Sequence, residues 1–512
     1  MARRAVMSVA DKTGIVDFAR DLTEAGWEII STGGTARILK DNHIHVMEVR
    51  EVTSSPEILG GRVKTLHPAI HGGILARRDN AGDMAQLQAN GIGLIDMVVC
   101  NLYPFVATAS RPDVTIDEMI EEIDIGGPTM LRAAAKNWLW TIPVCNPARY
   151  PEIAREIRLT GDVDRVTRRH LALEVFNHTA TYDSAISAYL GGLWKGWPLD
   201  FPEELALGFN KALSLRYGEN PHQKAAYYEP VLAGGQESIV KRQLQGKELS
   251  YNNIWDADAA YSTAWEFSQP TCCIVKHASP CGVAIGATPK EAYERAFLGD
   301  PVSAFGGVVA FNCEVDGETA EAMKKLFFEV LLVPSLTPEA SEAFKAKRDL
   351  RVIIAGKPAN RRFSVRTALG GLLVQEQDTL LPIDEDWQVV SRRAPTDSEI
   401  RDLRFAMTVC KHVRSNSIVL AKDGAVIGIG GGQPNRVDCV RIAVERGKDR
   451  VRGTCMASDA FFPFPDSVEE AAKAGVSAIA HPGGSIRDQE SLAAADAHGI
   501  AMVVTGKRHF LH

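Results

Sequence analysis

The sequence predicts an α/β protein, because short apolar strands alternate with amphipathic helices and glycine-rich turns follow the strands. Residues 27–30 and 95–100 are the two clearest strands. Residues 123–128 lead into a helix that runs through 133–135, with Pro128 suited to its first position. This alternation favours a parallel sheet that binds ligands at the carboxyl ends of its strands.

The first predicted helix follows from the spacing of its apolar residues. Ile15, Phe18, Ala19 and Leu22 recur at helical intervals, and Gly26 ends the helix.

Composition excludes several classes of protein. The chain has 512 residues, 45% of them hydrophobic and 24% charged, which is enough for large buried cores. A net charge of −7 gives no general attraction to nucleic acid or to an anionic membrane. Nine cysteines without a C-x-x-C spacing favour a reducing compartment. Asp11 interrupts the first apolar run and no run nears ~18 residues, so we expect a cytoplasmic protein without a signal peptide or membrane span.

Two segments break the periodic pattern. Residues 191–210 crowd Gly, Pro and aromatic residues together and are the best candidate linker, and residues 376–396 form a second break. Thr396 and Glu399 then make a capping box at the start of a helix. Its apolar positions are Ile400, Leu403 and Met407.

A Lys-His pair occurs twice in similar apolar surroundings, at 276–277 and at 411–412. Imidazole can move a proton at neutral pH, and an adjacent ammonium can stabilise a developing negative charge. The pairs lie 135 positions apart (411 − 276), whereas a second match, of 303–307 to 459–463, has an offset of 156 (460 − 304). Duplication and chance are about equally good explanations of these short matches.

Two turns and one helix face could hold an anion. The run at 60–68 combines two glycines, Arg62, Lys64, a hydroxyl and an imidazole, and the turn at 32–35 offers free N–H groups at a helix start. Arg132 and Lys136 lie four apart on one helix face. Simple chain reversal for the turns, a solvated face for the cations and packing of Tyr103 below Pro104 are the alternatives. Together these three features favour anion binding.

Several common motifs fail. The segment 246–248 lacks the Ser or Thr of a Walker A loop, and 428–433 breaks the dinucleotide-binding glycine pattern. Neither H-E-x-x-H nor a His/Cys zinc spacing occurs, so no metal site is expected.

Longer motifs resemble a known family. They are the segments 60–68, 124–127, 131–137, 216–223, 275–277, 415–417, 428–433 and 458–464. With these motifs the chain is similar, over nearly its whole length, to the bifunctional purine-biosynthesis family that joins an AICAR formyltransferase to an IMP cyclohydrolase.

The resemblance implies two domains, a homodimer and a co-substrate. Residues 1–195 are expected to form a methylglyoxal-synthase-like parallel-sheet domain, the cyclohydrolase. Residues 196–512 are expected to form the formyltransferase, a tandem of cytidine-deaminase-like subdomains without zinc that divide near 376–396. The implied ligands are AICAR, formyl-AICAR, IMP and the reduced folate 10-formyltetrahydrofolate, with no metal or bound prosthetic group.

For formyl transfer, the resemblance supports His277 as general base and Lys276 as stabiliser of the oxyanion or of the departing folate nitrogen. Glu329 stands where relatives carry Asp, and the second pair, Lys411-His412, is expected to be structural. The substrate contacts implied are Arg216, Tyr217, Gly306, Glu329, Asn416, Arg436, Asp459 and Arg508.

For ring closure, the resemblance implies that Lys136 and Asp124 handle protons, while Lys64 and Tyr103 polarise the formyl oxygen or guide the leaving water. Folding the substrate into a reactive geometry should supply much of the rate. The implied nucleotide contacts are Lys12, Thr32, Gly33, Gly34, Thr35, Arg62, Thr65, Asn101 and Gly126.

Two rival hypotheses remain open at this point. One is a nucleotide-sensing or scaffold protein that kept the folds and lost turnover. The other is an aldehyde-forming lyase of the methylglyoxal-synthase type in the first domain.

Overall fold

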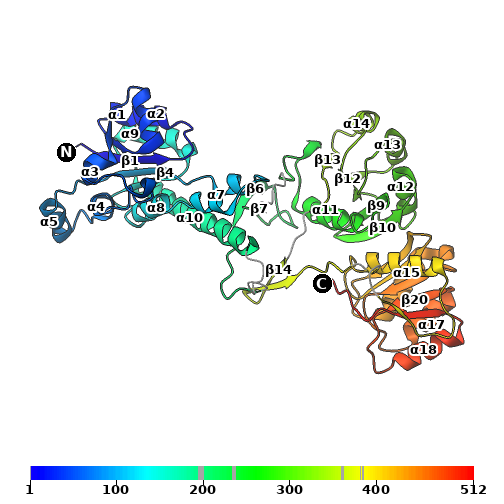
Figure 1. Ribbon diagram of the computed structural model, residues 1–512. Coiled ribbons are helices and arrows are strands. Elements are labelled where there is room, and N and C mark those ends of the chain that lie inside the picture. Colours follow the sequence, from blue (N-terminus) through cyan, green and yellow to red (C-terminus); the bar gives the residue numbers. More distant parts are fainter. Residues whose placement is uncertain (1, 194–200, 233–237, 359–362, 381, 383–385) are drawn as a thin grey trace. The chain divides into compact units, whose positions relative to one another are not determined.

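The computed structural model describes residues 2–193, 201–232, 238–358, 363–380, 382 and 386–512 (Figure 1). The chain divides into two compact units, residues 1–210 with 229–235, and residues 211–228 with 236–512. Every helix in the described ranges is too short or too polar to span a membrane.

The first unit is built on a five-stranded sheet in the order β3-β2-β1-β4-β5, in which all neighbours are parallel. Its strands are β1 (Arg4–Val9), β2 (Glu28–Ser31), β3 (Val46–Glu48), β4 (Met97–Asn101) and β5 (Ile142–Val144). The expected parallel α/β fold of this part of the chain is therefore confirmed.

Helices cover both faces of this sheet. One apolar core lies beneath α1 (Ile15–Glu24), α2 (Gly33–Asp41) and α9 (Tyr150–Thr160). The opposite core lies beneath α4 (Pro68–Leu75), α8 (Gly126–Lys136) and α10 (Arg165–Leu193). The shorter elements are α3 (Val49–Thr53), η1 (Leu59–Gly61), α5 (Ala81–Ala89), α6 (Phe105–Ala109), α7 (Ile116–Glu121) and η2 (Pro147–Arg149).

The boundaries agree with most of the sequence expectations. All four apolar residues predicted for the first helix are buried in α1. The third predicted helix begins at Gly126, so Pro128 is its third residue and not its first. A proline is tolerated at this third position because the first four N–H groups of a helix have no partner within it. The predicted linker is wrong for residues 191–193, which end α10, while 194–200 lie outside the described residues.

The second unit contains a 12-stranded sheet, in the order β16-β21-β20-β19-β17-β18-β10-β9-β11-β12-β13-β8. Its edge strands are β16 (Gln388–Val389) and β8 (Gln243–Gln245). Two separate hairpins pair β6 (Phe209–Leu215) with β7 (Ala225–Pro230), and β14 (Phe363–Ala368) with β15 (Gly371–Glu376).

Two successive runs of the same elements make up this sheet, green and yellow-to-red in Figure 1. The first run is α11 (Tyr251–Ala264), β9 (Thr271–Lys276), β10 (Ser279–Ile285), α12 (Pro289–Phe297), β11 (Gly307–Phe311), α13 (Gly317–Met323), β12 (Phe328–Val333), α14 (Pro338–Lys345) and β13 (Arg351–Ile354). The second is α15 (Asp397–Cys410), β17 (Ser417–Lys422), β18 (Ala425–Gly431), α16 (Arg436–Gly447, followed by η4, Lys448–Val451), β19 (Cys455–Ser458), α17 (Asp466–Ala474), β20 (Ala478–His481), α18 (Asp488–Ala497) and β21 (Ala501–Val504).

The element order and strand pairing show that the second unit is a structural repeat. In both repeats the central hairpin is antiparallel and the next three strands follow in the same order. Gly282 and Gly428 are equivalent, and a Cβ on either would collide with a carbonyl of the following helix, Ala296 O or Ala443 O. The offset near the hairpin is 146 residues (417 − 271).

The residue matches that first suggested duplication are nevertheless wrong. Lys276 ends a strand, whereas Lys411 follows the end of helix α15. Likewise, 303–307 leads into β11, whereas 459–463 follows β19. At the true offset, His277 corresponds to Asp423. Short sequence matches therefore indicated the repeat but not its register.

A buried ionic cluster joins the two repeats. Lys411 Nζ lies 2.8 Å and His412 Nε2 2.9 Å from Glu266 Oε1, and the Lys411 side chain is only 4% exposed. Burial alone would raise the pKa of Glu266, but hydrogen bonds and charges from His412 and Lys411 lower it. The second Lys-His pair thus contributes a buried contact between the repeats.

Lys411→Ala should destabilise the second unit strongly, because it leaves the Glu266 carboxylate buried with one partner fewer. We expect a loss of about 3 kcal/mol in the free energy of unfolding, measured by denaturant titration. Lys345→Ala is the control, since its pair with Glu342 is exposed and should contribute less than about 1 kcal/mol. Equal effects of the two substitutions would contradict this role for the cluster.

His481 ends β20 and is buried, with Gly483 N donating a hydrogen bond of 3.2 Å to its Nδ1. Burial lowers the pKa of His481 to about 4, with Asp488 acting in the opposite direction and Arg436 in the same direction. In the unfolded chain, therefore, His481 is protonated below about pH 6.5, whereas in the folded chain it is protonated only below about pH 4.

The contribution of His481 to stability is consequently present above pH 6.5 and lost as the pH falls towards about 4. His481→Asn keeps an acceptor near the Gly483 N–H and removes the titration. Between these pH values, the unfolding free energy of the unmodified protein should fall on the order of 3 kcal/mol more than that of the variant. Parallel pH profiles from denaturant titrations would refute the assignment.

Candidate functional site

In the first unit, the carboxyl ends of three neighbouring parallel strands gather most of the residues expected to bind a nucleotide. Asn101, at the end of β4, accepts hydrogen bonds from Ala10 N at 2.5 Å and Asp11 N at 2.8 Å. Thr35 Oγ1 bonds both backbone groups of Val9, at 3.1 Å. These contacts fix the chain after β1 between the ends of β2 and β4.

The turn after β2 presents backbone to the same place. Thr32 precedes α2, and Gly33 adopts a positive φ of 57°. A Cβ on Gly33 would lie 3.5 Å from Lys64 Nζ, so this ammonium lies directly beside the turn. Lys12 donates to the carbonyls of Val9 and Ala10, and burial lowers its pKa.

Lys64 brings a second loop to this cluster. Its Nζ lies 2.9 Å from Glu57 Oε1. The next residue, Thr65, is buried, and a Cβ on Gly126 would lie only 2.8 Å from its Oγ1. The anion-binding run and the start of α8 are therefore in contact.

Asp124 introduces a half-buried carboxyl at the start of α8. Its Oδ1 accepts a hydrogen bond of 2.8 Å from Gly127 N, and Gly127 has no room for a Cβ beside Asp124 Oδ2. Burial raises the pKa of Asp124 above its usual value, against the effect of its hydrogen bonds. Tyr103 is half exposed, and partial burial together with the Asp124 charge raises its phenol pKa.

Three expected residues stand apart from this cluster. Arg62 forms an exposed pair with Glu121 of α7 at 2.5 Å. Lys136 ends α8, ten residues after Gly126, which corresponds to about 15 Å along the helix axis. Its neighbour on that helix face, Arg132, stacks over the Phe176 ring at 5.5 Å. A role for Lys136 in proton transfer stays a prediction, and its position within one chain does not favour it.

Residues expected for the second activity lie along one edge of the 12-stranded sheet. Ala284 of β10 pairs antiparallel with Ala425 of β18, so β10 begins at the edge where β18 ends. We call this row of strand ends, which runs across the sheet and is distinct from its outer strands, the site edge. The strands β9, β19, β20 and β21 also end there, and β11, β12 and β17 begin there.

The first repeat contributes the β9–β10 turn to the site edge. Lys276 Nζ donates to Phe305 O at 2.8 Å, which brings it beside Gly306. The His277 side chain is exposed. Asp256 of α11 accepts hydrogen bonds from the backbone N–H groups of His277 and Ala278. Glu329, at the start of β12, forms an ion pair of 2.7 Å with Arg351.

The second repeat contributes a buried ion pair. The Arg436 guanidinium, 5% exposed, pairs with the fully buried Asp459 carboxylate. Arg436 also donates to Ser458 Oγ at 2.9 Å and to Asn416 Oδ1 at 2.5 Å. The guanidinium is therefore held in a fixed orientation by three acceptors from two strand ends.

The terminal segment and the β6 hairpin complete the set. His509 N donates to Asp459 O at 3.1 Å, which places Arg508 next to the Arg436–Asp459 pair, where it stacks on Phe510 at 4.8 Å. Arg216 donates to the Tyr217 hydroxyl at 2.8 Å. Asn252, at the start of α11, donates to Glu219 O at 3.4 Å and so ties this turn to the first repeat.

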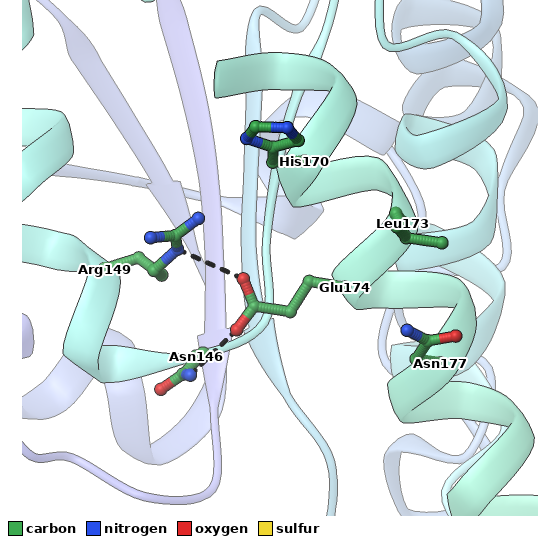
Figure 2. A pocket seen from close by; sticks show the side chains of 6 residues that line it. All are labelled: Asn146, Arg149, His170, Leu173, Glu174 and Asn177. Atoms are coloured by element: carbon green, nitrogen blue, oxygen red, sulfur yellow. Dashed lines mark hydrogen bonds and ion pairs between the residues drawn. The ribbon is translucent and has the colours of Figure 1, made fainter. Parts of the chain in front are cut away.

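A different cavity, shown in Figure 2, contains none of the expected residues. Its acid, Glu174 of α10, accepts hydrogen bonds from Asn146 at 2.8 Å and from Arg149 at 3.2 Å. Asn146, Arg149 and Glu174 thus bind one another at this cavity. No grouping of His, Cys, Asp and Glu with the makings of a metal site occurs in the described ranges.

Comparisons with known proteins now identify the family. Residues 134–446 match the family described as AICARFT/IMPCHase bienzyme, and residues 14–129 match the MGS-like domain. The protein named Bifunctional purine biosynthesis protein PurH of Desulfitobacterium hafniense is 51% identical over 520 residues, with full coverage of both chains. The protein of the same name from Bacillus cytotoxicus is 50% identical over 514 residues, also with full coverage.

A match to one solved structure, the crystal structure of ForH, includes 37% of this chain and 100% of the ForH chain, with 34% sequence identity and a TM-score of 0.34. That score is too low to bear on the fold. The full-length similarity and the two matching family descriptions carry the assignment. The chain belongs to the AICARFT/IMPCHase bienzyme family.

Proposed function

We propose that this chain catalyses the last two steps of IMP synthesis, formyl transfer to AICAR and closure of formyl-AICAR to IMP. Residues 196–512 carry the transfer, with 10-formyltetrahydrofolate as co-substrate, and residues 1–195 carry the closure. The observation that supports this most is the site edge, where a Lys-His turn and a held guanidinium lie on one side of a single sheet.

Formyl transfer needs a base, because the aromatic amine of AICAR is weakly nucleophilic. As the amine nitrogen bonds to the formyl carbon, His277 takes its proton. Lys276 stabilises the oxyanion and then the folate nitrogen, which leaves as the carbon–nitrogen bond breaks and takes up a proton. The exposed imidazole at the end of β9 is accessible to such a substrate.

The remaining residues of the site edge hold the substrates. Arg436 and Arg508 supply fixed positive charge for phosphate or carboxylate groups. Asn416 and Asp459 orient Arg436, and Arg216 with Tyr217 offers a stacked cation and ring beside α11. Gly306 lies beside the Lys-His turn, and Glu329 begins β12, two strands from β9, with its carboxylate directed by Arg351.

Ring closure takes place at the strand-end cluster of the first unit. The carboxamide nitrogen attacks the formyl carbon, and the formyl oxygen leaves as water after gaining two protons. Asp124 takes one proton from the attacking carboxamide nitrogen, which its raised pKa favours, and passes it to the departing oxygen. The second proton of the water comes from the formamido N–H as the ring C=N bond forms, while Lys64 and Tyr103 polarise the formyl oxygen. The turns at 32–35 and 64–65, with Lys12, Asn101 and Gly126, bind the phosphoribosyl group.

The protein is proposed to be a cytoplasmic homodimer that binds neither nucleic acid nor membrane. The comparisons give no support to a sensor or scaffold without turnover. Incubation with AICAR and 10-formyltetrahydrofolate should yield IMP, whereas a sensor would yield none. Incubation with dihydroxyacetone phosphate tests the lyase hypothesis, which methylglyoxal formation would favour.

His277→Ala should reduce formyl transfer by at least about 100-fold, because the proton acceptor is lost. Cyclisation of added formyl-AICAR should be unchanged, because its residues lie in the other unit. Asp423→Ala is the matched control, since Asp423 occupies the equivalent turn of the second repeat and should leave both rates intact. Equal loss of both activities in His277→Ala would contradict separate sites.

Asp124→Asn should slow cyclisation of formyl-AICAR by about 100-fold or more, because an amide keeps the Gly127 hydrogen bond but accepts no proton. Formyl transfer should be unaffected. Asp17→Asn on the exposed face of α1 serves as the control. Full cyclisation by Asp124→Asn would remove this carboxyl from the mechanism.

A further inference from the structure

The turn that presents His277 has an unfavourable backbone conformation. His277 and Ala278 both have φ near 55°, in the left-handed region. Residues with a Cβ rarely adopt this region, and alanine has no side chain that could compensate by a local hydrogen bond. Something outside the turn must therefore hold it.

Asp256, on the second turn of α11, supplies that hold. Its Oδ1 accepts a hydrogen bond of 2.7 Å from Ala278 N, and its Oδ2 accepts one of 3.3 Å from His277 N. The carboxyl is about half-buried, and burial raises its pKa even though both N–H groups lower it. Partial burial of a carboxylate on a helix costs free energy, and its two hydrogen bonds with the turn offset that cost.

The second repeat contains the same arrangement without the histidine. Asp402 of α15 accepts hydrogen bonds from Asp423 N at 2.9 Å and from Gly424 N at 2.8 Å. Lys422 Nζ donates to Arg452 O, as Lys276 donates to Phe305 O. In this copy, however, Asp and Gly occupy the two left-handed positions, which both residue types tolerate.

Comparison of the two turns isolates what is special in the first. Both repeats use an aspartate 21 residues before the turn (277 − 256 and 423 − 402) to bind two successive N–H groups. In the first repeat, the two residues that this aspartate binds, a histidine and an alanine, disfavour the left-handed conformation, and the turn carries an imidazole. The aspartate is therefore needed most at the turn that carries the proposed base.

We propose that Asp256 is a positioning residue for formyl transfer, which holds the 277–278 backbone in its left-handed conformation and thereby sets where the His277 imidazole stands. The proposal rests on the function proposed for His277. Asp256 itself contacts the backbone of the turn and need not contact the substrate.

The test compares Asp256→Asn with Asp402→Asn in the full-length protein. Each substitution exchanges a double acceptor for a group with one acceptor and one donor, so one N–H of each turn loses its partner. We expect Asp256→Asn to lower kcat for formyl transfer about tenfold or more, with little change in KM for AICAR. Asp402→Asn should leave this kcat within about twofold, because its turn lies at the opposite sheet edge.

Two further measurements separate positioning from general damage. Thermal unfolding of the same preparations reports whether the second unit of each variant is folded, and cyclisation of formyl-AICAR reports on the first unit. Adding Ala278→Gly to Asp256→Asn should restore part of the lost kcat, by about threefold or more, because glycine adopts a positive φ without strain.

The outcomes are distinct. Equal kcat losses in Asp256→Asn and Asp402→Asn, or no recovery with Ala278→Gly, would overturn the positioning role while an inactive His277→Ala still supports the proposed function. Active His277→Ala would overturn both.

Discussion

The antiparallel contact between β10 and β18 is the constraint on which the second unit depends. It joins two copies of one αβ unit through Ala284 and Ala425, and it reverses one copy relative to the other. Because of this reversal, the hairpin turn of the first repeat meets the opposite strand ends of the second. The Lys276-His277 turn and the Arg436–Asp459 pair consequently reach a common edge, although about 160 residues separate them (436 − 276).

The same reversal explains why the two repeats have diverged so unevenly. At the other edge, the positions equivalent to Arg436 and Asp459 are Pro289 and Asn312, the first residue of α12 and the residue after β11. Asn312 donates to Phe267 O and Gln269 O, both at 2.8 Å, so its amide serves the local backbone. At the equivalent turn of that edge, Asp423 stands in place of the histidine, so the turn presents a carboxylate and not an imidazole.

Sequence reasoning placed the strand ends of the first sheet, because turns after apolar runs are local features. Asn101 and Asp124 were expected as site residues from the family resemblance, and the structure places them at one end of the first sheet. The sequence could not place Lys136, since helical spacing tells which face a residue occupies but not which end of the sheet it approaches. Asp256 was missed because it lies on a helix 21 residues before the turn it holds, within no short motif.

The register of the duplication shows the same limit from another direction. The Lys-His pairs are chemically identical, yet one follows a strand and the other a helix, where Lys411 is needed to pair with Glu266. What the repeats retain is backbone support: Gly282 and Gly428 against a helix, and Asp256 and Asp402 beneath a turn. Because these residues are required by the backbone geometry, they are the same in both repeats, whereas the side chains at the turn differ. A duplicated enzyme fold is thus aligned more reliably by the residues that hold its turns than by the residues its turns display.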